Sequence, residues 1–383
     1  MRFLHTSDWH LGRTFHGAGL LDEQVAAIDA MAEMVRAEGI DVVVVAGDLY
    51  DRQIPPADAV TALSEGLSRL RSAGATVVAI TGNHDSPVRL RFGDRLLAQA
   101  GVHLRGDVRG AGTPVVVPAS DGGSDVFVYP IPYLEPEVAR HQLAAGSERT
   151  HEAVLGLALD RARADLATRG PARSLAVAHA FAAGGVPCDS ERVLRVGGGD
   201  RVSLGCFDGF DYVALGHLHG RQVFGDGRMR YSGSPLPYSF SERAHRKGVW
   251  VVDIPPEAPL HVEAVDLPVQ RELAAVRGTL DELLRSPEFA EAEECWVQAT
   301  LTDVVLPRDC MGRLRQRFKW AASLLHDPPL TALDHRTYRE RVAGRGDVEL
   351  VADFVAHVTG EPAADDDLSV CREVVDEVSA AVA

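Results

Sequence analysis

The chain has 383 residues, of which 46% are hydrophobic and 25% are charged, and this composition is ordinary for a globular protein and disfavours a disordered one. Its length is sufficient for one large domain and one or two smaller ones. The net charge of -16 excludes a protein that coats nucleic acid through a generally basic surface, because nonspecific affinity comes from Lys and Arg side chains that neutralise phosphates. Any contact with nucleic acid must therefore be local, assisted by metal ions or shared with a partner.

The sequence carries no strong targeting or redox signal. No apolar run reaches the roughly 18–20 residues that a membrane-spanning helix needs, and the first strand-like segment leads directly into Asp8 and not into the apolar stretch of a cleavable leader. We therefore expect a cytoplasmic protein. The five cysteines are scattered and form no C-x-x-C pair, which predicts thiols that are free or buried as small apolar groups: Cys188, Cys206, Cys295, Cys310 and Cys371.

Up to about residue 270, short runs rich in β-branched residues alternate with amphipathic stretches. Apolar residues three or four positions apart predict helices over 25–35 and 59–70. Compact apolar runs predict strands at 3–7, 42–46, 76–80, 126–129, 175–178, 212–215 and 248–254. Strands that alternate with helices in this order predict an α/β sandwich built on sheets.

Two segments of this region are predicted to be excursions from the sheets. The stretch 120–125 is rich in Gly, Asp and Ser and indicates a turn between strands. The stretch 151–168 is rich in Ala, Arg and Glu and indicates a helix outside the core.

After Pro268 the pattern changes, and we predict a small second domain there. It consists of a helix-like segment over 273–284, a strand over 295–301 and a basic amphipathic stretch over 311–325. Two helices are predicted at the end of the chain, each with one apolar face: Leu350, Val351, Phe354 and Val358 in the first, and Leu368, Cys371, Val375 and Val378 in the second.

Five short polar motifs lie at the ends of predicted strands: Asp8-x-His10, Gly47-Asp48, Gly82-Asn83-His84-Asp85, Ala178-His179 and Gly216-His217-x-His219. Side chains at strand ends converge above an open α/β sheet. The glycines that precede Asp48, Asn83 and His217 permit tight turns and a close approach of the backbone to a ligand. We therefore expect the five motifs to meet at one site.

The chemistry of these side chains indicates a metal centre. Carboxylate oxygens, imidazole nitrogens and one amide oxygen, without a thiolate, suit Mn²⁺, Fe²⁺ or Zn²⁺ at two neighbouring positions. Two such ions clamp the phosphate in an in-line phosphoester hydrolysis. Taken singly, an Asp beside a Gly is usually a turn residue and a strand-end His is usually a satisfied polar group. The order of all five motifs favours the joint functional interpretation.

That order resembles the calcineurin-like metallophosphoesterase superfamily. Finer features are similar to the SbcD family, the nuclease subunits of bacterial SbcCD complexes, and they lie at residues 6–12, 47–51 and 232–235, with a weaker likeness at 354–360. The resemblance implies a β-sandwich flanked by helices, a small α+β capping domain and a C-terminal helical segment that binds the partner. In residue numbers it implies a nuclease domain over 1–268, a capping domain over 269–330 and an ATPase-binding segment over 331–383.

Carried over residue by residue, the resemblance implies two divalent metal ions, with Mn²⁺ expected. It implies seven ligands: Asp8, His10 and His219 at the first ion, Asn83, His179 and His217 at the second, and Asp48 between them. It also implies that His84 stabilises the transition state or protonates the leaving oxygen, and that Asp85 orients the His84 imidazole.

One position departs from the pattern of distant relatives. Archaeal and eukaryotic members carry a second catalytic His shortly after the bridging Asp, whereas this chain has Asp51 there, as bacterial SbcD-like sequences do. The departure puts in doubt any mechanism taken from those distant members. Arg13 and His16, just after the first motif, are further candidates for contact with DNA.

The residues alone predict metal-dependent hydrolysis of a phosphoester, and the resemblance implies a DNA nuclease. It implies a coiled-coil SbcC-type ATPase partner, single- and double-stranded DNA as substrates, and a homodimer within a heterotetramer. One alternative is a metallophosphatase or a phosphodiesterase acting on another substrate, since one fold serves many substrates. Another is an inactive scaffold, which the complete ligand set disfavours.

The basic run Arg313, Arg315, Arg317 and Lys319 is compatible with DNA contact and with a solvated helix face.

Overall fold

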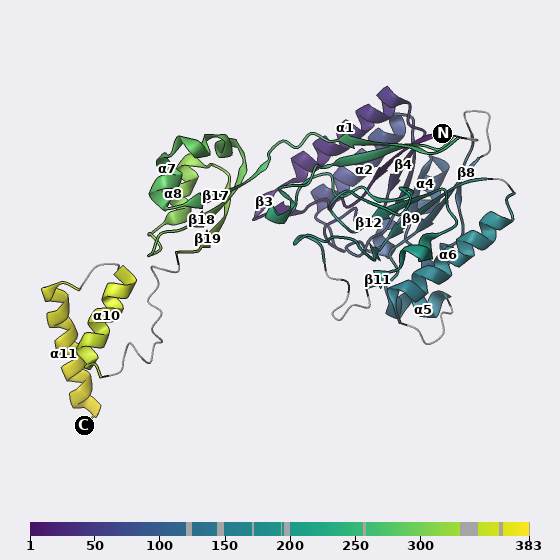
Figure 1. Ribbon diagram of the computed structural model, residues 1–383. Helices are drawn as coiled ribbons and strands as arrows, with labels where there is room; N and C mark the ends of the chain where they lie inside the picture. Colours follow the sequence, from purple (N-terminus) through teal and green to yellow (C-terminus); the bar gives the residue numbers. More distant parts are fainter. Residues whose placement is uncertain are drawn as a thin grey trace. The chain divides into compact units, whose positions relative to one another are not determined.

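The computed structural model describes residues 1–119, 125–143, 149–170, 172–192, 194, 200–255, 258–329, 344–359 and 363–382. The chain separates into two compact units, Met1–Gln270 and Arg271–Ala383 (Figure 1). In the described part, no helix is both long enough and apolar enough to cross a membrane.

The first unit contains two six-stranded sheets. In one, the strand order is β16-β15-β1-β4-β5-β6. Its strands β1, β4, β5 and β6 run parallel, and β15 and β16 join antiparallel at one side. The bounds are Arg2–Thr6 for β1, Val42–Val45 for β4, Thr76–Ile80 for β5, Val102–Arg105 for β6, Gly248–Asp253 for β15 and His261–Asp266 for β16.

In the other sheet the order is β13-β14-β12-β9-β8-β7, parallel from β14 to β8 and antiparallel at both edges. The bounds are Val115–Val117 for β7, Val126–Ile131 for β8, Arg173–His179 for β9, Tyr212–Gly216 for β12, Gln222–Phe224 for β13 and Met229–Tyr231 for β14. Strands β6, β7, β13, β14 and β16 were not predicted from the sequence, because they are short or lie near sheet edges.

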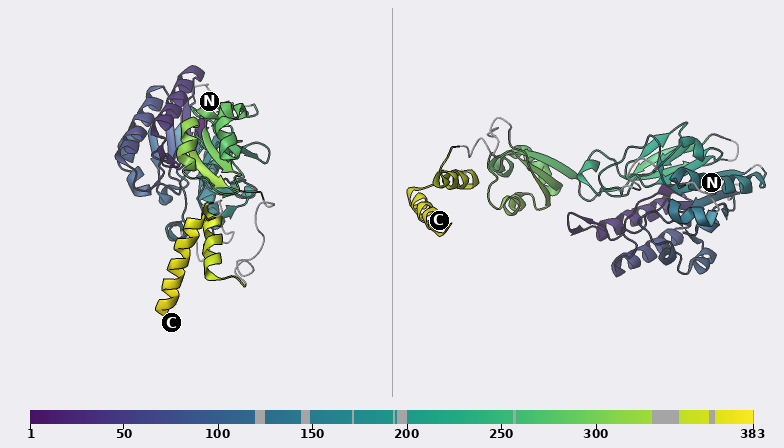
Figure 2. Two further views of the ribbon diagram at one scale, coloured as in Figure 1. Left: turned by 90° about the vertical axis from the view of Figure 1, so that its left-hand side faces the viewer. Right: turned by 90° about the horizontal axis from the view of Figure 1, so that it is seen from below.

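Helices cover the outer faces of both sheets and create four layers, as Figure 1 and the views in Figure 2 show. On the first sheet lie α1 (Leu21–Glu38), α2 (Ala57–Ser72), α3 (Pro87–Leu90) and α4 (Asp94–Gln99). On the second lie α5 (Pro136–Leu143) and α6 (His151–Ala167). Three apolar clusters correspond to the three spaces between these layers. The mixed α/β fold is confirmed.

The alternation of side chains along β4 shows why four consecutive valines form a central strand. Val43 and Val45 pack against the helices, whereas Val42 and Val44 pack against the other sheet. Successive side chains of a strand point to opposite faces. A strand covered on both sides therefore needs apolar residues at every position.

Smaller elements complete the first unit. They are the hairpin β2 (Thr14–Phe15) and β3 (Ala18–Gly19), the pair β10 (Phe181–Ala182) and β11 (Arg201–Val202), and the 3-10 helices η1 (Val108–Gly110), η2 (Leu204–Phe207) and η3 (Phe240–Glu242). These elements lie in connections between the larger strands and helices.

The second unit contains a three-stranded parallel sheet, β17-β18-β19, with its own apolar core. Its elements are β17 (Leu273–Gly278), α7 (Leu280–Arg285), η4 (Pro287–Glu294), β18 (Trp296–Leu301), α8 (Cys310–Arg317) and β19 (Ala321–His326). Two further helices, α10 (Asp347–Thr359) and α11 (Asp365–Val382), contact each other. The assignment of separate capping and partner-binding segments remains a prediction.

Several expectations need correction. The helix expected outside the core is α6, which buries Val154, Leu155 and Leu159 against the second sheet. The larger apolar residues of α6 alternate with Ala and Arg, and for this reason its buried face was not predicted from the sequence. Of the turn expected at 120–125, residues 120–124 lie outside the described residues.

In the second unit, segments expected to be single elements are divided. The stretch 273–284 is a strand followed by a helix, because Thr279 and Glu282 form a capping box that starts α7. The stretch 311–325 is likewise split into α8 and β19. The last helix begins with an acidic run that includes Asp366 and Asp367, and carboxylates there stabilise a helix N-terminus.

Candidate metal centre

The five polar motifs lie at the carboxyl ends of the parallel strands β1, β4, β5, β9 and β12, and Ala178-His179 forms the last two residues of β9 itself. Three of these strands belong to one sheet and two belong to the other. The candidate ligands therefore come from both layers of the sandwich. Hydrogen bonds between the loops fix them together, for example from the amide of His10 to the carbonyl of Asp48 at 2.9 Å.

The backbone at this site is strained. Four candidate ligands have a positive φ: 55° at Asp8, 47° at His10, 52° at Asp48 and 109° at His217. Such angles are uncommon for residues other than glycine and are retained where the surrounding structure enforces them. Their concentration at one site indicates function.

Two glycines permit the loops to approach each other, as the sequence predicted. A Cβ atom at Gly82 would collide with the carboxylate of Asp48, and one at Gly216 would collide with the carbonyl of Ala46. Any side chain at either position would push the strand-end loops apart.

Asp8, His10 and His219, expected at the first ion, are brought together. Nε2 of His10 lies 3.1 Å from Nε2 of His219. Asp8 is fully buried, and its carboxylate accepts hydrogen bonds from the Ser7 hydroxyl at 2.5 Å and from the His217 amide at 3.1 Å. One ligand atom from each of the three residues falls within 4.8 Å of the other two.

Asn83, His179 and His217, expected at the second ion, also meet. Oδ1 of Asn83 lies 2.8 Å from Nε2 of His179 and 3.3 Å from Nδ1 of His217. The other ring nitrogen of His179, Nδ1, lies 2.9 Å from the Ala46 carbonyl. A carbonyl can only accept, so Nδ1 carries the proton and Nε2 is available as a ligand.

Asp48 lies between the two groups. Its Oδ2 is 3.7 Å from Nε2 of His10 and 3.5 Å from Nε2 of His179. Its Oδ1 accepts a hydrogen bond of 2.8 Å from the backbone amide of His84. This position between one imidazole of each group fits a bridging carboxylate.

Burial disfavours the charged form of two carboxylates and four imidazoles at the site. Desolvation raises the pKa of Asp8 to about 7 and raises the pKa of Asp48 well above its usual value. Desolvation also lowers the pKa of His84 and His219 to about 4, and lowers the pKa of His10 and His217 well below the usual value. A bound cation would favour the ionised carboxylates and would use neutral imidazoles as ligands.

The residues present therefore fit two divalent cations. Three overlapping groups of potential ligands lie in the site: Asp8, His10 and His219; Asp8, Asp48 and His179; and His10, Asp48 and His84. Buried Nδ1 of His10 and Nδ2 of Asn83 also lack a hydrogen-bond partner among the described residues. Oxygen and nitrogen donors in this combination suit Mn²⁺, Fe²⁺ or Zn²⁺.

The expected role of Asp85 needs correction. Its carboxylate does not take the hydrogen bond of His84 Nδ1 but accepts three backbone amides, those of Leu49 at 3.1 Å, Tyr50 at 2.9 Å and Gly82 at 2.9 Å. It therefore joins the loops after β4 and β5. Nδ1 of His84 lies instead 2.7 Å from the carbonyl of Asp51, and this carbonyl orients the ring.

Arg13 contacts residues beside the centre, whereas the ring contacts of His16 are to two phenylalanines. Nη2 of Arg13 donates to the Ser190 carbonyl at 2.8 Å, and Nη1 lies 3.7 Å from Oδ1 of Asp51. That Nη1 is buried and has no hydrogen-bond partner among the described residues. His16 is exposed in the turn of the β2–β3 hairpin, where its ring contacts Phe15 and Phe240.

Sequence reasoning missed several residues that support the site. Gln24, on α1, donates from Nε2 to the carbonyl of His10 at 2.7 Å and accepts from the amide of Gly12 at 3.1 Å. Tyr238 donates its hydroxyl to the carbonyl of Trp9 at 2.5 Å. A polar residue on the apolar face of α1 was a possible signal for Gln24, whereas Tyr238 reaches the site only through the tertiary fold.

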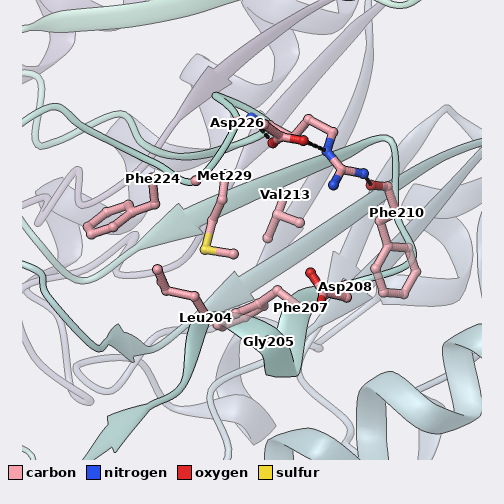
Figure 3. Close-up of a pocket in the computed structure, with 11 residues that line it drawn as sticks. Leu204, Gly205, Phe207, Asp208, Phe210, Val213, Phe224, Asp226 and Met229 are labelled. Carbon is pink, nitrogen blue, oxygen red and sulfur yellow. Dashed lines mark hydrogen bonds and ion pairs between the residues drawn. The ribbon is translucent and has the colours of Figure 1, made fainter.

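Two cavities differ in their relation to this centre. One of about 490 Å³ borders it and is lined by Asn83, Gln53, Tyr133 and Arg192, among others. Another, of about 290 Å³, is lined mainly by apolar side chains such as Phe207, Phe224 and Met229 (Figure 3). In the described part of the chain, no candidate metal-binding group includes a residue of this second cavity.

A sequence model of the calcineurin-like phosphoesterase family matches residues 1–221. This match covers more than half of the chain, and the chain belongs to that family. It is therefore a hydrolase of phosphate esters whose relatives use divalent metals. A second model, for the SbcD C-terminal domain and described as a type 5 capsule protein repressor C-terminal domain, matches residues 269–359.

Solved structures with distant similarity include TT1561 from Thermus thermophilus, at 14% identity and a TM-score of 0.42, covering 70% of this chain and 99% of that one. A dimetal phosphatase from Danio rerio has 14% identity and a TM-score of 0.40, covering 70% and 96%. GAP50, the anchor in the inner membrane complex of Plasmodium, has 11% identity and a TM-score of 0.37, covering 87% and 99%.

Proposed function

We propose that this chain is the nuclease subunit of an SbcCD-type complex and hydrolyses DNA phosphodiester bonds in repair, replication and recombination. The activities proposed are ATP-stimulated exonuclease action on duplex ends and endonuclease action on single strands and hairpins. The observation that carries the proposal is the combination of a site able to hold two metal ions with the match of residues 269–359 to the SbcD C-terminal domain.

We assign seven residues to the metal ions: Asp8, His10 and His219 to the first, Asn83, His179 and His217 to the second, and Asp48 to both. Mn²⁺ is the proposed metal. When bound, two divalent ions would neutralise negative charge that develops on the phosphate. The strained loops hold the ligands in place before binding, so little rearrangement is needed when the ions arrive.

His84 and Arg13 are proposed to act on the phosphodiester. The proton on Nδ1 of His84 is committed to the Asp51 carbonyl, so proton exchange with the leaving oxygen would use Nε2. Arg13 has a buried Nη1 for which the described residues provide no hydrogen-bond acceptor. A phosphate oxygen would satisfy this donor, because guanidinium groups pair well with phosphate.

We propose that α10 and α11 bind the coiled-coil ATPase. The two helices contact each other, yet Phe354 and Val358 of α10 stay 67% and 58% exposed, and Val374 and Val378 of α11 stay 53% and 58% exposed. Exposed apolar faces on helices are suited to docking against a partner helix.

We also propose a homodimer. Val88, Phe92 and Leu96 are 82%, 89% and 72% exposed and follow one another at intervals of four residues through α3, the turn after it and α4. A second copy would cover this apolar patch, as in a two-fold interface that uses the same surface on both subunits. In the following text, the dimer patch means these three residues.

A metallophosphatase or a phosphodiesterase with a non-DNA substrate is the alternative, because the same metal core serves many phosphoesters. The separating experiment is a cleavage assay of the purified chain on blunt duplex DNA, hairpin DNA and p-nitrophenyl phosphate. It is run with Mn²⁺, Mg²⁺ or chelator, and with and without the ATPase and ATP. Asp48→Ala is the control for contaminating nuclease. Hydrolysis of the small ester without DNA cleavage would refute the nuclease proposal.

A further inference from the structure

A buried polar chain leads away from the ring of His219 on the side opposite the proposed metal ion. Nδ1 of His219 lies 2.6 Å from Oγ of Ser190, and Oγ of Ser190 lies 2.6 Å from Oε1 of Glu242. His219, Ser190 and Glu242 are only 1%, 9% and 1% exposed. Each hydrogen bond in this chain therefore replaces one that water would otherwise make.

The far end of the chain is a buried ion pair. Lys247, 4% exposed, donates to Oε2 of Glu242, to the Ser234 hydroxyl at 2.9 Å and to the His219 carbonyl at 2.8 Å. These three acceptors use all three hydrogens of the ammonium group. Oε1 of Glu242 also accepts the amide of Tyr238 at 3.0 Å. The partners of Glu242 are thus donors, as an ionised carboxylate requires.

The number of available hydrogens fixes which atom donates in each hydrogen bond between His219, Ser190 and Glu242. An ionised carboxylate has no hydrogen to give, so the Ser190 hydroxyl must donate its single proton to Glu242. Oγ of Ser190 can then only accept from His219, which requires a hydrogen on Nδ1. Nε2 of His219 is left with a lone pair, and in the metal-free chain it accepts from Nε2 of His10 at 3.1 Å.

We propose that Ser190, Glu242 and Lys247 are positioning residues that hold the proton of His219 on Nδ1 and so present Nε2 to the first metal ion. The metal part of this inference rests on the proposed function, whereas the tautomer is a property of the chain itself. Partners of this kind fix the ring orientation and tautomer of metal-bound histidines and typically change metal affinity by ~10–100-fold.

A competing interpretation is a separate metal site, because Cys188, His219 and Glu242 also offer ligand atoms within 4.8 Å of one another. The geometry disfavours it. Glu242 is already paired with Lys247, and Nδ1 of His219 is occupied by Ser190. Sγ of Cys188 lies 3.2 Å from Oγ of Ser190, where the thiol can donate to the remaining lone pair of the hydroxyl.

The tautomer is tested by nitrogen-15 NMR of the histidine-labelled, metal-free full chain, with the His219 signals assigned by their loss in His219→Gln. Wild type is expected to show a hydrogen on Nδ1. Ser190→Thr keeps the hydroxyl and should keep this tautomer, whereas Ser190→Ala should give a mixture. A hydrogen on Nε2 in the wild type would overturn the proposal.

Glu242→Gln gives a test in which the expected change of the His219 tautomer has a defined direction. The amide oxygen would face Lys247, because the charged ammonium is a stronger donor than the Tyr238 amide, whose hydrogen bond to this side chain would be lost. The amide NH₂ would then donate to Ser190, and the Ser190 hydroxyl would turn to donate to Nδ1 of His219. His219 should then switch to the tautomer with hydrogen on Nε2. If Glu242→Gln folds, as judged by circular dichroism, and keeps the wild-type tautomer, the directional chain is wrong. If it does not fold, Ser190→Ala decides the question.

Metal binding gives the second readout, by titration calorimetry with Mn²⁺. Ser190→Ala should weaken one of two binding events by ~10–100-fold and leave the other unchanged, and Ser190→Thr should restore it. Equal affinities in wild type and Ser190→Ala would overturn the positioning role. Cys188→Ser should bind as wild type does, and loss of an ion in this variant would favour the competing site. A wild type that binds no divalent ion would refute the proposed function, while the NMR result would still decide the tautomer.

Discussion

His84 and Asp48 make different contributions to the candidate centre, although both side chains are buried there. Asp48 faces imidazoles of both proposed metal positions, whereas the His84 ring is held by the Asp51 carbonyl and lies with its centroid 4.6 Å from that of His10. His84 also belongs to a group that could hold a cation. Substitutions can separate an acid–base role from a ligand role.

We predict that His84→Ala keeps both metal ions and loses cleavage. A general acid or base contributes ~10²–10⁴-fold to the rate, so the turnover rate should decrease by a factor of this size. Metal content, measured by elemental analysis, should remain at the wild-type value. Loss of an ion from this variant would show that His84 is a ligand.

We predict that Asp48→Ala loses both ions, because its carboxylate compensates the charge of two cations that otherwise repel each other. Asn83→Ala is the matched comparison, since Asn83 is assigned to one ion only and should lose only that one. Stoichiometry is measured by elemental analysis after dialysis, with circular dichroism as the control for folding. Equal metal content in the two variants would contradict the bridging role.

At the scale of elements, the strands that carry the motifs could be predicted, and the supports around them could not. Thr76–Ile80 is a run of apolar and β-branched residues that ends at a Gly-Asn-His-Asp motif, so both the strand and its functional end were visible. Ser190 and Lys247 have no comparable local pattern. Their roles depend on hydrogen bonds to residues 29 and 28 positions away, and such contacts exist only in the folded chain.

Strand β1 also carries a buried histidine outside the metal centre. Nε2 of His5 lies 3.1 Å from the Leu215 carbonyl and Nδ1 lies 3.1 Å from the Tyr212 hydroxyl. Burial lowers the pKa of His5 to about 3, against ~6.5 in an unfolded chain. The folded state therefore resists protonation that the unfolded state accepts.

We predict that His5 makes the protein less stable as the pH falls from about 6.5 toward 3. In this window the unfolded chain binds the proton and the folded chain does not, so the contribution is at most ~1.4 kcal/mol per pH unit. His5→Gln should show a shallower dependence of its unfolding free energy on pH between 7 and 5, measured by urea denaturation of the metal-free protein. Parallel curves for the two proteins would contradict the prediction.

At the scale of the whole molecule, two sets of exposed apolar side chains in the described part of the chain bear on assembly: the dimer patch on the first unit and the faces of α10 and α11 on the second. Soluble monomers rarely leave contiguous apolar surface uncovered. The two surfaces are assigned to different partners and can be tested independently.

We predict that Leu96→Glu converts a dimer into a monomer without loss of folding, because it introduces a charge into the dimer patch. Leu306→Glu is the matched control, since Leu306 is also exposed, at 46%, but lies in the second unit. Light scattering after gel filtration gives the mass. A wild type that is already monomeric, or a Leu96→Glu variant that stays dimeric, would refute the assignment of this patch.

We predict that truncation after residue 345, which removes α10 and α11, abolishes co-purification with the ATPase and stimulation by ATP. Metal-dependent cleavage of single strands should remain largely intact, since the metal centre lies in the first unit. Phe354→Ser in the full chain is the milder variant and should weaken ATPase binding in a pull-down. Unchanged ATPase binding by the truncated chain would place the docking surface elsewhere.

The origin of the candidate ligands in both sheets has a consequence for how the chain is held together. Asp8, Asp48 and Asn83 follow strands of one sheet, whereas His179 ends a strand of the other sheet and His217 and His219 follow the neighbouring strand there. Under the proposed assignment, each ion would act as a non-covalent cross-link between distant parts of the chain: His10 and His219 are 209 positions apart, and Asn83 and His179 are 96. An unfolded chain cannot gather such distant groups without a large entropy loss. The free energy of metal binding would therefore stabilise only the folded sandwich. The bound ions would hold the two sheets together at the edge where catalysis is proposed.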